Sequence, residues 1–292
     1  MVSILIPTYN YSIVTLVQRV HEQCIEAQIP FEIICLDDQS KSEYYLENQT
    51  ISDLPNCFYS VNETNCGRTL TRQKLAEKAQ YDWLLFLDAD VIPAKITFIQ
   101  AYLDALQPST VIFGGYEYEK ELSDFNKILR YRYGKEREEK QASERNTHPY
   151  TYVFSGNMLV PKSIFLGLNY QASEKNYGMD IYFGYQLFQQ KIPVLHLDNP
   201  IIHLGLESNE IYFQKALQGV ESRKKYLLHE KEVDQMNPLV QAYTKLKKWR
   251  LTKLVAFGFR IVAPILKKNI LSTNPKLIYF DMYRLGYLCS LA

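Results

Sequence analysis

The chain has 292 residues, of which 47% are hydrophobic and 22% are charged, and its formal net charge is +1. This composition excludes a globally disordered chain, and the near-zero net charge gives no general electrostatic case for a nucleic-acid partner. The length allows one large domain or two smaller ones.

The first 115 residues alternate between short apolar runs and segments with helical spacing. Strands are predicted at 2–6, 31–36, 57–61, 83–87 and 111–113. Helices are predicted at 12–28, with Ser12 as a candidate N-cap, and at 42–50, 68–79 and 96–106. This alternation predicts a doubly wound, mostly parallel sheet flanked by helices.

The pattern changes after residue 115. Residues 116–150 are rich in charge and Tyr, and we expect them to form an insertion over the site with a helix at 121–141. Strands are predicted at 152–160 and 194–203, with a turn leading into a helix at 177–190, and the chain from 209 onward is predicted to be helical. We therefore divide it into segments 1–115, 116–208 and 209–292.

The cysteines and the N-terminus bear on the compartment. Five cysteines occur without a CxxC pair or a metal-ligand spacing, which is typical of free thiols in a reducing environment. The N-terminal run lacks the basic segment and cleavage site of a signal peptide, and no stretch has the roughly 18 uninterrupted apolar residues of a spanning helix. A cytoplasmic protein is expected.

Acidic residues follow two predicted strands. Asp37 and Asp38 follow strand 31–36, and Asp88 and Asp90 follow strand 83–87. Ligands of parallel α/β sheets bind outside the carboxyl ends of the strands. Two carboxylates spaced by one residue on a turn can share a divalent cation that also bridges phosphates, and oxygen ligands suit Mg²⁺ or Mn²⁺. The alternatives are structural: Asp90 could cap helix 96–106, and Asp37 and Asp38 could cap the segment that follows them.

Four motifs make this pattern specific. VSILIPTYN, LDDQS, NCGRTLTRQ and LLFLDAD occur in that order, and together they resemble the motifs of the inverting family 2 glycosyltransferases, which have the GT-A fold. The similarity covers residues 1–115 and continues more loosely through SGNMLVPKSIF and YGMDIYFGYQL to about residue 205.

The resemblance implies an enzyme that uses Mn²⁺ or Mg²⁺ to move a hexosyl or N-acetylhexosaminyl group from a nucleotide diphosphate sugar. A UDP-sugar is the leading expectation for the donor, and a saccharide or lipid-linked saccharide is expected as the acceptor. Segment 1–115 would then bind the nucleotide sugar, and segment 116–208 would bind the acceptor and supply the catalytic base.

The same resemblance assigns the first donor contacts. Pro7, Thr8 and Asn10 match the loop that lines the nucleotide pocket, although Pro7 could instead only end a strand. Asp37 or Asp38 matches the acidic residue that contacts uracil or ribose.

Further donor contacts follow in the next two motifs. Arg68 and Arg72 match a helix near the base and phosphates, although a solvated helix face would also explain them. Asp88, Ala89 and Asp90 match the DxD motif, in which Asp88 would contact ribose or the metal and Asp90 would ligate the metal directly.

Inverting transfer also needs a carboxylate that takes the proton from the acceptor hydroxyl. The family places it at a helix start after Gly and aromatic residues, and Asp180 in the segment YGMD matches it. Met179 stands where the family usually has Glu, and we expect it near the sugars. Asp180 could instead be a helix N-terminal carboxylate that the macrodipole stabilises.

Three residues of the second segment complete the predicted site. His203 matches the position of a His that completes the metal shell in several GT-A enzymes, with His196 as a weaker candidate, and imidazole is an acceptable Mn²⁺ ligand. Gly156 and Asn157 resemble the strand end at which donor and acceptor approach the backbone, since glycine has no Cβ to obstruct that approach. A lone His is also commonly a simple core or surface residue.

The C-terminal segment is basic and aromatic. A run of cations from Lys245 to Lys253 lies beside Trp249, Phe257 and Phe259. This pattern is typical of an interfacial helix that contacts anionic headgroups, which would place the protein at the inner face of a membrane and suit a lipid-linked acceptor. The alternative is a helix that packs on the catalytic domain.

Two other functions are compatible with part of the sequence. The departure at Met179 motivates a catalytically inactive nucleotide-sugar-binding protein. A sugar-nucleotidyltransferase would also be α/β with a metal-binding carboxylate, but its glycine-rich N-terminal loop is absent, because Ile6–Asn10 stands in its place.

Overall fold

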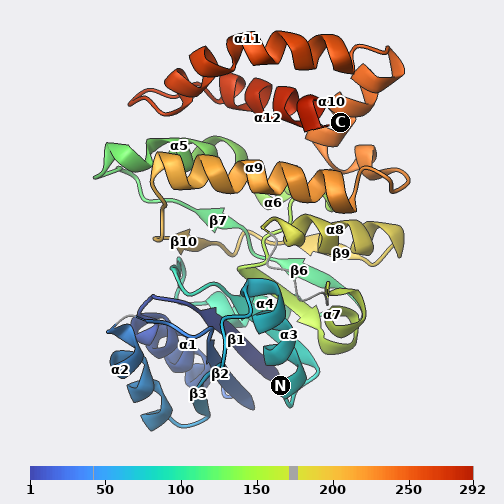
Figure 1. The fold of residues 1–292 in the computed structure, drawn as a ribbon. Coiled ribbons are helices and arrows are strands. Elements are labelled where there is room, and N and C mark those ends of the chain that lie inside the picture. The colour runs from blue at the N-terminus through green and yellow to red at the C-terminus, as the bar shows by residue number, and fades with distance from the viewer. Residues whose placement is uncertain (42, 171–176, 292) are drawn as a thin grey trace.

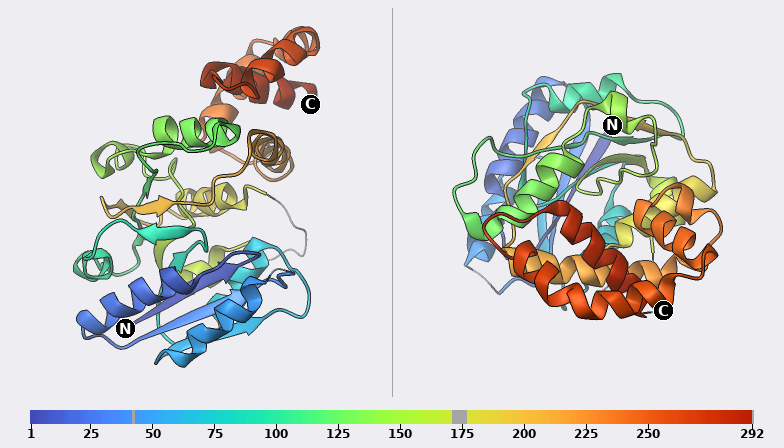
Figure 2. Two further views of the ribbon diagram at one scale, coloured as in Figure 1. Left: turned by 90° about the vertical axis from the view of Figure 1, so that its left-hand side faces the viewer. Right: turned by 90° about the horizontal axis from the view of Figure 1, so that it is seen from above.

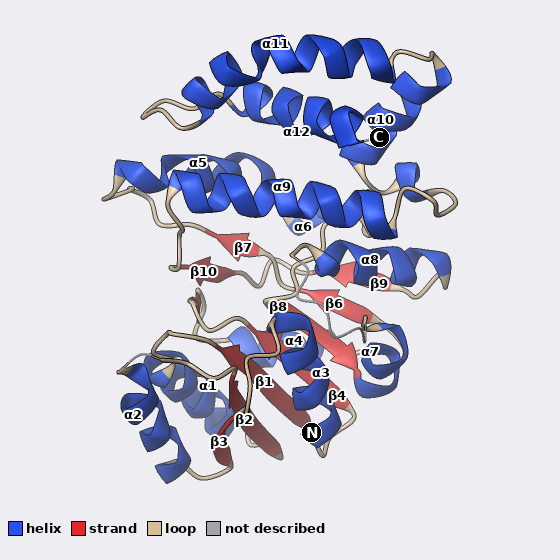
Figure 3. Ribbon diagram, in the orientation of Figure 1, coloured by secondary structure: helices blue, strands red, loops and turns tan. Residues whose placement is uncertain are grey.

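A central sheet organises the first two thirds of the chain. The computed structural model describes residues 1–41, 43–170 and 177–291. Within them, seven strands form a sheet of order β3-β2-β1-β4-β8-β6-β9 (Figures 1 and 3). The strands are β1 (Val2–Thr8), β2 (Phe31–Asp37), β3 (Cys57–Val61), β4 (Trp83–Leu87), β6 (Val111–Phe113), β8 (Asn157–Pro161) and β9 (Val194–His196). All adjacent pairs are parallel except those of β8, which runs antiparallel to β4 and β6. The predicted mostly parallel sheet is confirmed.

Helices cover both faces of this sheet. One face packs against α1 (Val14–Glu26) and α4 (Phe98–Asp104), and the other packs against α3 (Arg68–Lys78), α7 (Lys162–Leu168) and α8 (Met179–Gln189). Every residue of β2 is buried, as expected for a strand covered on both sides. Apolar runs without alternation therefore form the inner strands.

A small second sheet lies beside the carboxyl end of β4. It contains β5 (Val91–Pro93), β7 (Tyr116–Glu117) and β10 (Ile201–His203) in the order β5-β10-β7. The prediction of one strand over 194–203 is wrong, because β9 joins the large sheet and β10 the small one. The suggestion that Asp90 caps a helix is also wrong, since β5 follows it and α4 begins only after Thr97.

Several predicted boundaries move. Ser12 does not cap α1, whose N-cap is Ile13, because the Ser12 hydroxyl donates to Glu47 instead, at 2.9 Å. The predicted helix 42–50 becomes α2 (Tyr44–Gln49), and residue 42 lies outside the described residues. Strand 152–160 is shorter and begins at Asn157.

The predicted helix over 121–141 is broken into short pieces. They are a 3₁₀ turn (Phe125–Lys127), α5 (Ile128–Tyr133), a π-helical turn (Gly134–Glu138) and α6 (Ala142–Arg145). Gly134 lies under the ring of Tyr118, where a Cβ would overlap the ring atoms, so the backbone approaches that ring closely at the start of the π turn.

The C-terminal helices form two layers above the sheet. They are α9 (Asn209–Tyr226), α10 (Pro238–Lys248), α11 (Thr252–Ile270) and α12 (Leu277–Leu291). Ser208 and Asn237 cap α9 and α10 through their side chains. Phe280 of α12 packs on Tyr212 and Phe213 of α9, and α11 lies outermost, at the end of the molecule far from β1–β3 (Figures 1 and 2). In the part of the chain that the structure describes, no helix combines the length and apolarity needed to cross a bilayer.

Candidate active site

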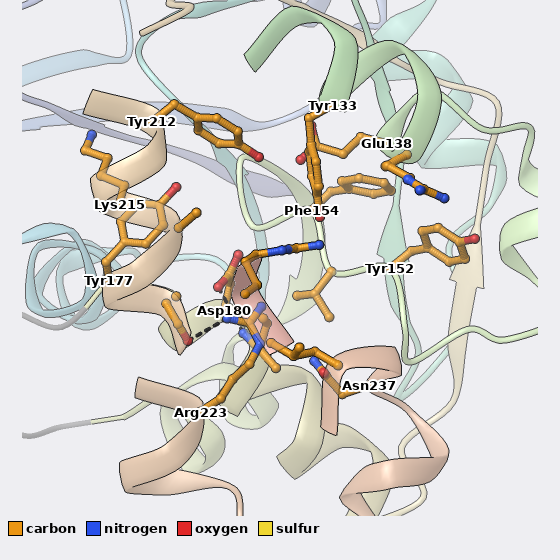
Figure 4. Close-up of a pocket in the computed structure, with 18 of the residues that line it drawn as sticks. Tyr133, Glu138, Tyr152, Phe154, Tyr177, Asp180, Tyr212, Lys215, Arg223 and Asn237 are labelled. Carbon is orange, nitrogen blue, oxygen red and sulfur yellow. Dashed lines mark hydrogen bonds between the residues drawn. The ribbon is translucent and has the colours of Figure 1, made fainter. Parts of the chain in front are cut away.

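Two cavities meet at the carboxyl end of β4. Both are lined by Arg68, Asp88 and Asp90. The smaller has a volume of about 330 Å³ and lies over the ends of β1 and β2. The larger has a volume of about 930 Å³ and extends between the small sheet and the C-terminal helices (Figure 4). The DxD segment therefore lies where a ligand in one cavity would meet a ligand in the other.

The smaller cavity contains part of the predicted nucleotide loop. Pro7 and Thr8 at the end of β1 line it, as does Ala89. Asn10 does not line it: this residue adopts a positive φ of 51°, and its side chain accepts from the Lys41 N–H at 3.0 Å. Asn10 thus helps to shape the loop, and its predicted contact with the nucleotide stays a prediction.

Asp37 and Asp38 both accept hydrogen bonds from within the protein, and the predicted nucleotide contact of Asp38 stays a prediction. Asp37 is fully buried and accepts from the Tyr59 hydroxyl at 2.7 Å and the Ser40 N–H at 2.6 Å, so its predicted contact with the nucleotide is wrong. Asp38 lines the smaller cavity, but its two oxygens accept from the N–H groups of Cys66 and Gly67, each at 2.7 Å. Asp38 therefore holds the turn that precedes α3.

That turn sets the position of two arginines. Arg68 and Arg72 begin α3 four residues apart and so share one helix face. Arg68 donates to one carboxylate oxygen of Asp88 at 3.0 Å, and Arg72 donates to the other. Arg72 is only 6% exposed, which excludes a solvated face for it. Burial would raise the pKa of Asp88, but Arg72 and Arg68 outweigh burial and hold that pKa below its usual value.

The ion pairs bear on the predicted metal set. Both Asp88 oxygens accept from arginines, so this carboxylate already carries two cationic partners, and its predicted role as a metal ligand stays a prediction. Across residues 1–41, 43–170 and 177–291, no group of three or more His, Cys, Asp or Glu side chains is arranged to hold a metal. The described residues at this site instead bring together two candidate metal ligands.

Asp90 and His203 form that pair. Nε2 of His203 lies 3.6 Å from Oδ2 of Asp90, within the about 4.2 Å that two bonds of about 2.1 Å to one small cation can span. Nδ1 of His203 is buried without a hydrogen-bond partner, and the ring lies beside Tyr116 and Tyr118. Burial lowers the pKa of His203, although Asp90 opposes this, so the imidazole is neutral near pH 7, the form that binds metals. The pair fits a divalent cation completed by ligand oxygens.

Two glycines allow the side chains of Asp88 and Asp90 to lie directly against the backbone. A Cβ at Gly156 would lie 2.5 Å from Cγ of Asp88, and a Cβ at Gly205 would lie 2.6 Å from Cγ of Asp90. Gly156 therefore serves the close approach that we predicted for it, but toward Asp88. Asn157 is fully buried, and its side chain bonds to Tyr102, Gly115 and Asn199, so its predicted sugar contact is wrong.

Asp180 faces the large cavity from the first turn of α8 (Figure 4). Gly178 precedes the helix with φ of 84°, a left-handed conformation that favours glycine and turns the chain into α8. Met179 is 6% exposed and points with Phe183 into a cavity of about 50 Å³ behind Asp180. Met179 thus supports the helix start and does not face the large cavity.

The family follows from the sequence match. The profile described as Glycosyl transferase family 2 matches residues 3–165, more than half of the chain. The chain belongs to glycosyl transferase family 2. No curated protein matches this glycosyltransferase.

Solved structures share the fold of the glycosyltransferase. The mannosyltransferase PcManGT of Pyrobaculum calidifontis, in complex with GDP-Man and Mn²⁺, has a TM-score of 0.56 and 12% identity, over 99% of this chain and 85% of that one. TarS 1–349 of S. aureus has a TM-score of 0.52 and 18% identity, over 80% and 68%. Its complex with UDP-GlcNAc has a TM-score of 0.51 and 18% identity, over 80% and 70%. The predicted GT-A fold is confirmed.

Sequence patterns did not predict most of the residues that line the large cavity of the glycosyltransferase. Its walls carry seven aromatic side chains from distant segments: Tyr116, Tyr133, Tyr150, Tyr152, Phe154, Tyr177 and Tyr212. Cations from α5 and α9, among them Arg130 and Arg223, also line the cavity, and Figure 4 shows Lys215 and Arg223 of α9 there. The Tyr-rich composition of 116–150 was a signal for part of this wall, whereas no pattern in α9 distinguishes its inward residues.

His196 has a structural role in the glycosyltransferase. Its Nδ1 lies 3.1 Å from Nη1 of the buried Arg145, and its Nε2 lies 2.9 Å from the carbonyl oxygen of Pro149. The ring stacks on Phe113 and lines neither cavity, so His196 as a candidate metal ligand is wrong.

This environment makes stability depend on pH. Burial lowers the pKa of His196 to about 4, with Arg145 adding to that effect. Because the unfolded chain binds this proton below about pH 6.5 and the folded chain only near pH 4, stability is lost as pH falls between these values, by about 3 kcal/mol. We expect urea unfolding to show a shallower loss between pH 7 and pH 4 in His196→Gln. Equal slopes in both proteins would contradict this explanation.

Proposed function

We propose that this glycosyltransferase inverts the anomeric centre of a nucleotide diphosphate sugar, with Asp180 as the general base. Six carboxylates line the large cavity: Asp88, Asp90, Glu138, Asp180, Glu207 and Asp281. Five of them lie in pairs with Arg, Lys or His. Asp180 alone among the six has no such partner in the described chain, and this observation carries the proposal. A carboxylate without a bound cation is the better proton acceptor.

The proposed chemistry joins the two cavities. The donor would occupy the smaller cavity with its diphosphate at Arg68 and Asp90, so that the sugar projects into the larger one. Asp180 would take the proton from an acceptor hydroxyl as that oxygen attacks the anomeric carbon and the nucleotide diphosphate leaves. TarS with UDP-GlcNAc and PcManGT with GDP-Man bind nucleotide sugars on this fold, which supports such a donor. We propose a UDP-sugar.

The test is a transfer and hydrolysis assay. UDP- and GDP-sugars are supplied with Mn²⁺, and release of the nucleotide diphosphate is measured with and without saccharide acceptors. Release that depends on the donor supports the proposal. Tight nucleotide binding without turnover would favour an inactive binding protein instead.

A divalent cation is part of the proposal. Asp90 and His203 would hold Mn²⁺ or Mg²⁺ together with diphosphate oxygens, and the cation would offset the charge that develops on the leaving group. PcManGT, which shares the fold, was solved with Mn²⁺.

Removing either ligand should abolish the effect of the metal on nucleotide binding. In the wild type, we expect UDP with Mn²⁺ to raise the Tm more than UDP alone, because a ligand that binds only the folded state stabilises it. Asp90→Asn and His203→Gln should lose that Mn²⁺-dependent increment and nearly all transfer activity. Asp104→Asn, an exposed carboxylate on α4, is the control. If the Mn²⁺-dependent rise in Tm were unchanged in both site variants, Asp90 and His203 would not be the residues that hold the cation.

The acceptor is proposed to be a saccharide or a lipid-linked saccharide in the large cavity. Its walls combine aromatic faces, which suit sugar rings, with charged groups that can bond hydroxyls. A lipid-linked acceptor would require peripheral contact with a membrane, and we propose the inner face of the cytoplasmic membrane.

A further inference from the structure

The C-terminal segment carries a large unbalanced charge. Residues 238–270 contain no Asp or Glu but eight cations: Lys245, Lys247, Lys248, Arg250, Lys253, Arg260, Lys267 and Lys268. Lys267 pairs with Glu210 at 3.4 Å, and the other seven have no ion-pair partner within the described residues. The whole chain has a net charge of only +1, so this segment is a local concentration of positive charge and not part of a basic surface everywhere.

The same segment exposes a stripe of large apolar side chains. Leu254, Phe257, Ile261 and Ile265 of α11 are 64–71% exposed and are spaced by three or four residues, which puts them on one helix face. Trp249, just before α11, is 68% exposed. We call these five residues the outer face of α11.

The inner face of α11 is already occupied. Phe259 packs edge-to-face on Tyr283 of α12, with ring centroids 4.9 Å apart, and fills the space above Gly286. Leu266 and Ile270 are buried against the same layer. The outer face is therefore not needed to hold the helix to the protein, and α11 is the outermost helix in Figure 1.

We propose that the outer face of α11 docks on an anionic lipid surface, with the flanking lysines and arginines on headgroups and the apolar side chains in the acyl boundary. An amphipathic helix with cations around its apolar stripe has the composition of an interfacial helix. A second copy of this chain is a poor occupant, because two such faces would bring like charges together without a single carboxylate from either segment.

Docking in this way would give a lipid-linked acceptor a short path from the membrane to the large cavity. Ile278 and Met282 of α12 are 58% and 49% exposed and line the large cavity, and α12 lies directly beneath α11. The cavity that is proposed to bind the acceptor is thus one helix layer from the lipid surface. This link rests on the proposed function, whereas the docking itself does not.

The experiment is co-sedimentation of the 292-residue chain with vesicles. We expect binding to phosphatidylcholine vesicles that contain phosphatidylglycerol, little binding to phosphatidylcholine alone, and weakening by high salt. Phe257→Ser with Ile261→Ser, and separately Lys247→Glu with Lys248→Glu, should each weaken binding by about tenfold or more. All four positions are exposed, so the fold should survive. Leu46→Ser, which is 70% exposed on α2, is the matched control and should bind like the wild type.

Other outcomes overturn the proposal. The lipid-docking proposal would be contradicted if the wild-type protein did not bind anionic vesicles. It would also be contradicted if the variant with Phe257→Ser and Ile261→Ser bound them as tightly as the wild type. Analytical ultracentrifugation tests the alternative occupant. If the wild type were a dimer and this double variant a monomer, the outer face of α11 would instead bind a second copy of the chain. Asp180→Asn should bind vesicles normally, so failure of the catalytic proposal and failure of lipid docking are distinguishable.

Discussion

Asp180→Asn should lower the rate of sugar transfer by about a thousandfold, since general base catalysis typically contributes about 10²- to 10⁴-fold. The amide has the shape of the carboxylate but cannot accept the acceptor's proton. Asp180 faces the cavity from the first turn of α8, and within the described residues its side chain accepts one hydrogen bond, from the adjacent N–H of Ile181, so the substitution leaves no buried partner there unpaired. We therefore expect kcat to fall and the Tm increment with UDP and Mn²⁺ to persist.

A matched control separates catalysis from helix electrostatics. Glu210 also lies in the first turn of a helix, α9, and among the described residues its side chain bonds to Gln214 and Lys267 at the surface. Glu210→Gln removes the same favourable interaction with a helix dipole and should leave transfer unchanged. If Asp180→Asn transferred sugar at the wild-type rate, the base would be another residue. Loss of nucleotide binding in the same variant would mean that the substitution disturbed the donor site.

Local patterns predicted the first half of the fold because its elements are short and strongly patterned. Strands such as β1 and β2 are buried on both faces and therefore appear as unbroken apolar runs. The positions of Asp88 and Asp90 followed from the strand WLLFL, because a chain leaving a parallel strand must emerge at the carboxyl edge of the sheet.

Roles within the site depend on contacts between distant segments. The two oxygens of Asp88 accept from Arg68 and Arg72, which requires the register between α3 and β4, and no spacing in the sequence encodes it. Asp90 meets His203 because β5 and β10 pair antiparallel, with Val91 opposite His203. The strands of the small sheet have only two or three residues and come from three distant segments, so local patterns did not predict this sheet.

The aspartates at strand ends also show why residue type alone misassigns roles. Asp37 lies at the motif position of ligand-binding acids, but it is fully buried and accepts from the Tyr59 hydroxyl and the Ser40 N–H. Asp38, by contrast, holds a turn and still lines the smaller cavity. The side-chain amide of Asn157 likewise makes its hydrogen bonds within the protein. A polar group at the mouth of a sheet binds a ligand only if the fold leaves it an unused donor or acceptor.

Gly205→Ala tests whether the position of Asp90 controls the metal site. A Cβ at Gly205 would overlap the Asp90 carboxylate, with Cγ 2.6 Å away, so Asp90 has to move and its geometry with His203 has to change. Gly205 is not among the residues with positive φ, so alanine is compatible with its backbone. Because a misplacement of about 1 Å in a catalytic group can cost about a hundredfold, we expect transfer to fall by about that factor while the fold survives.

The measurement pairs transfer rates with an Mn²⁺ titration. In Gly205→Ala, half-maximal activity should require more Mn²⁺ than in the wild type, because only the geometry of the Asp90–His203 pair has changed. Gly167→Ala is the matched control: it lies in α7 with no atom within 4 Å of an added Cβ, and it should leave transfer unchanged and stabilise the helix by about 0.5–1 kcal/mol. An unaltered Mn²⁺ dependence in Gly205→Ala would show that Asp90 does not hold the cation, and the charge on the departing diphosphate would then have to be met by Arg68 and its neighbours on α3.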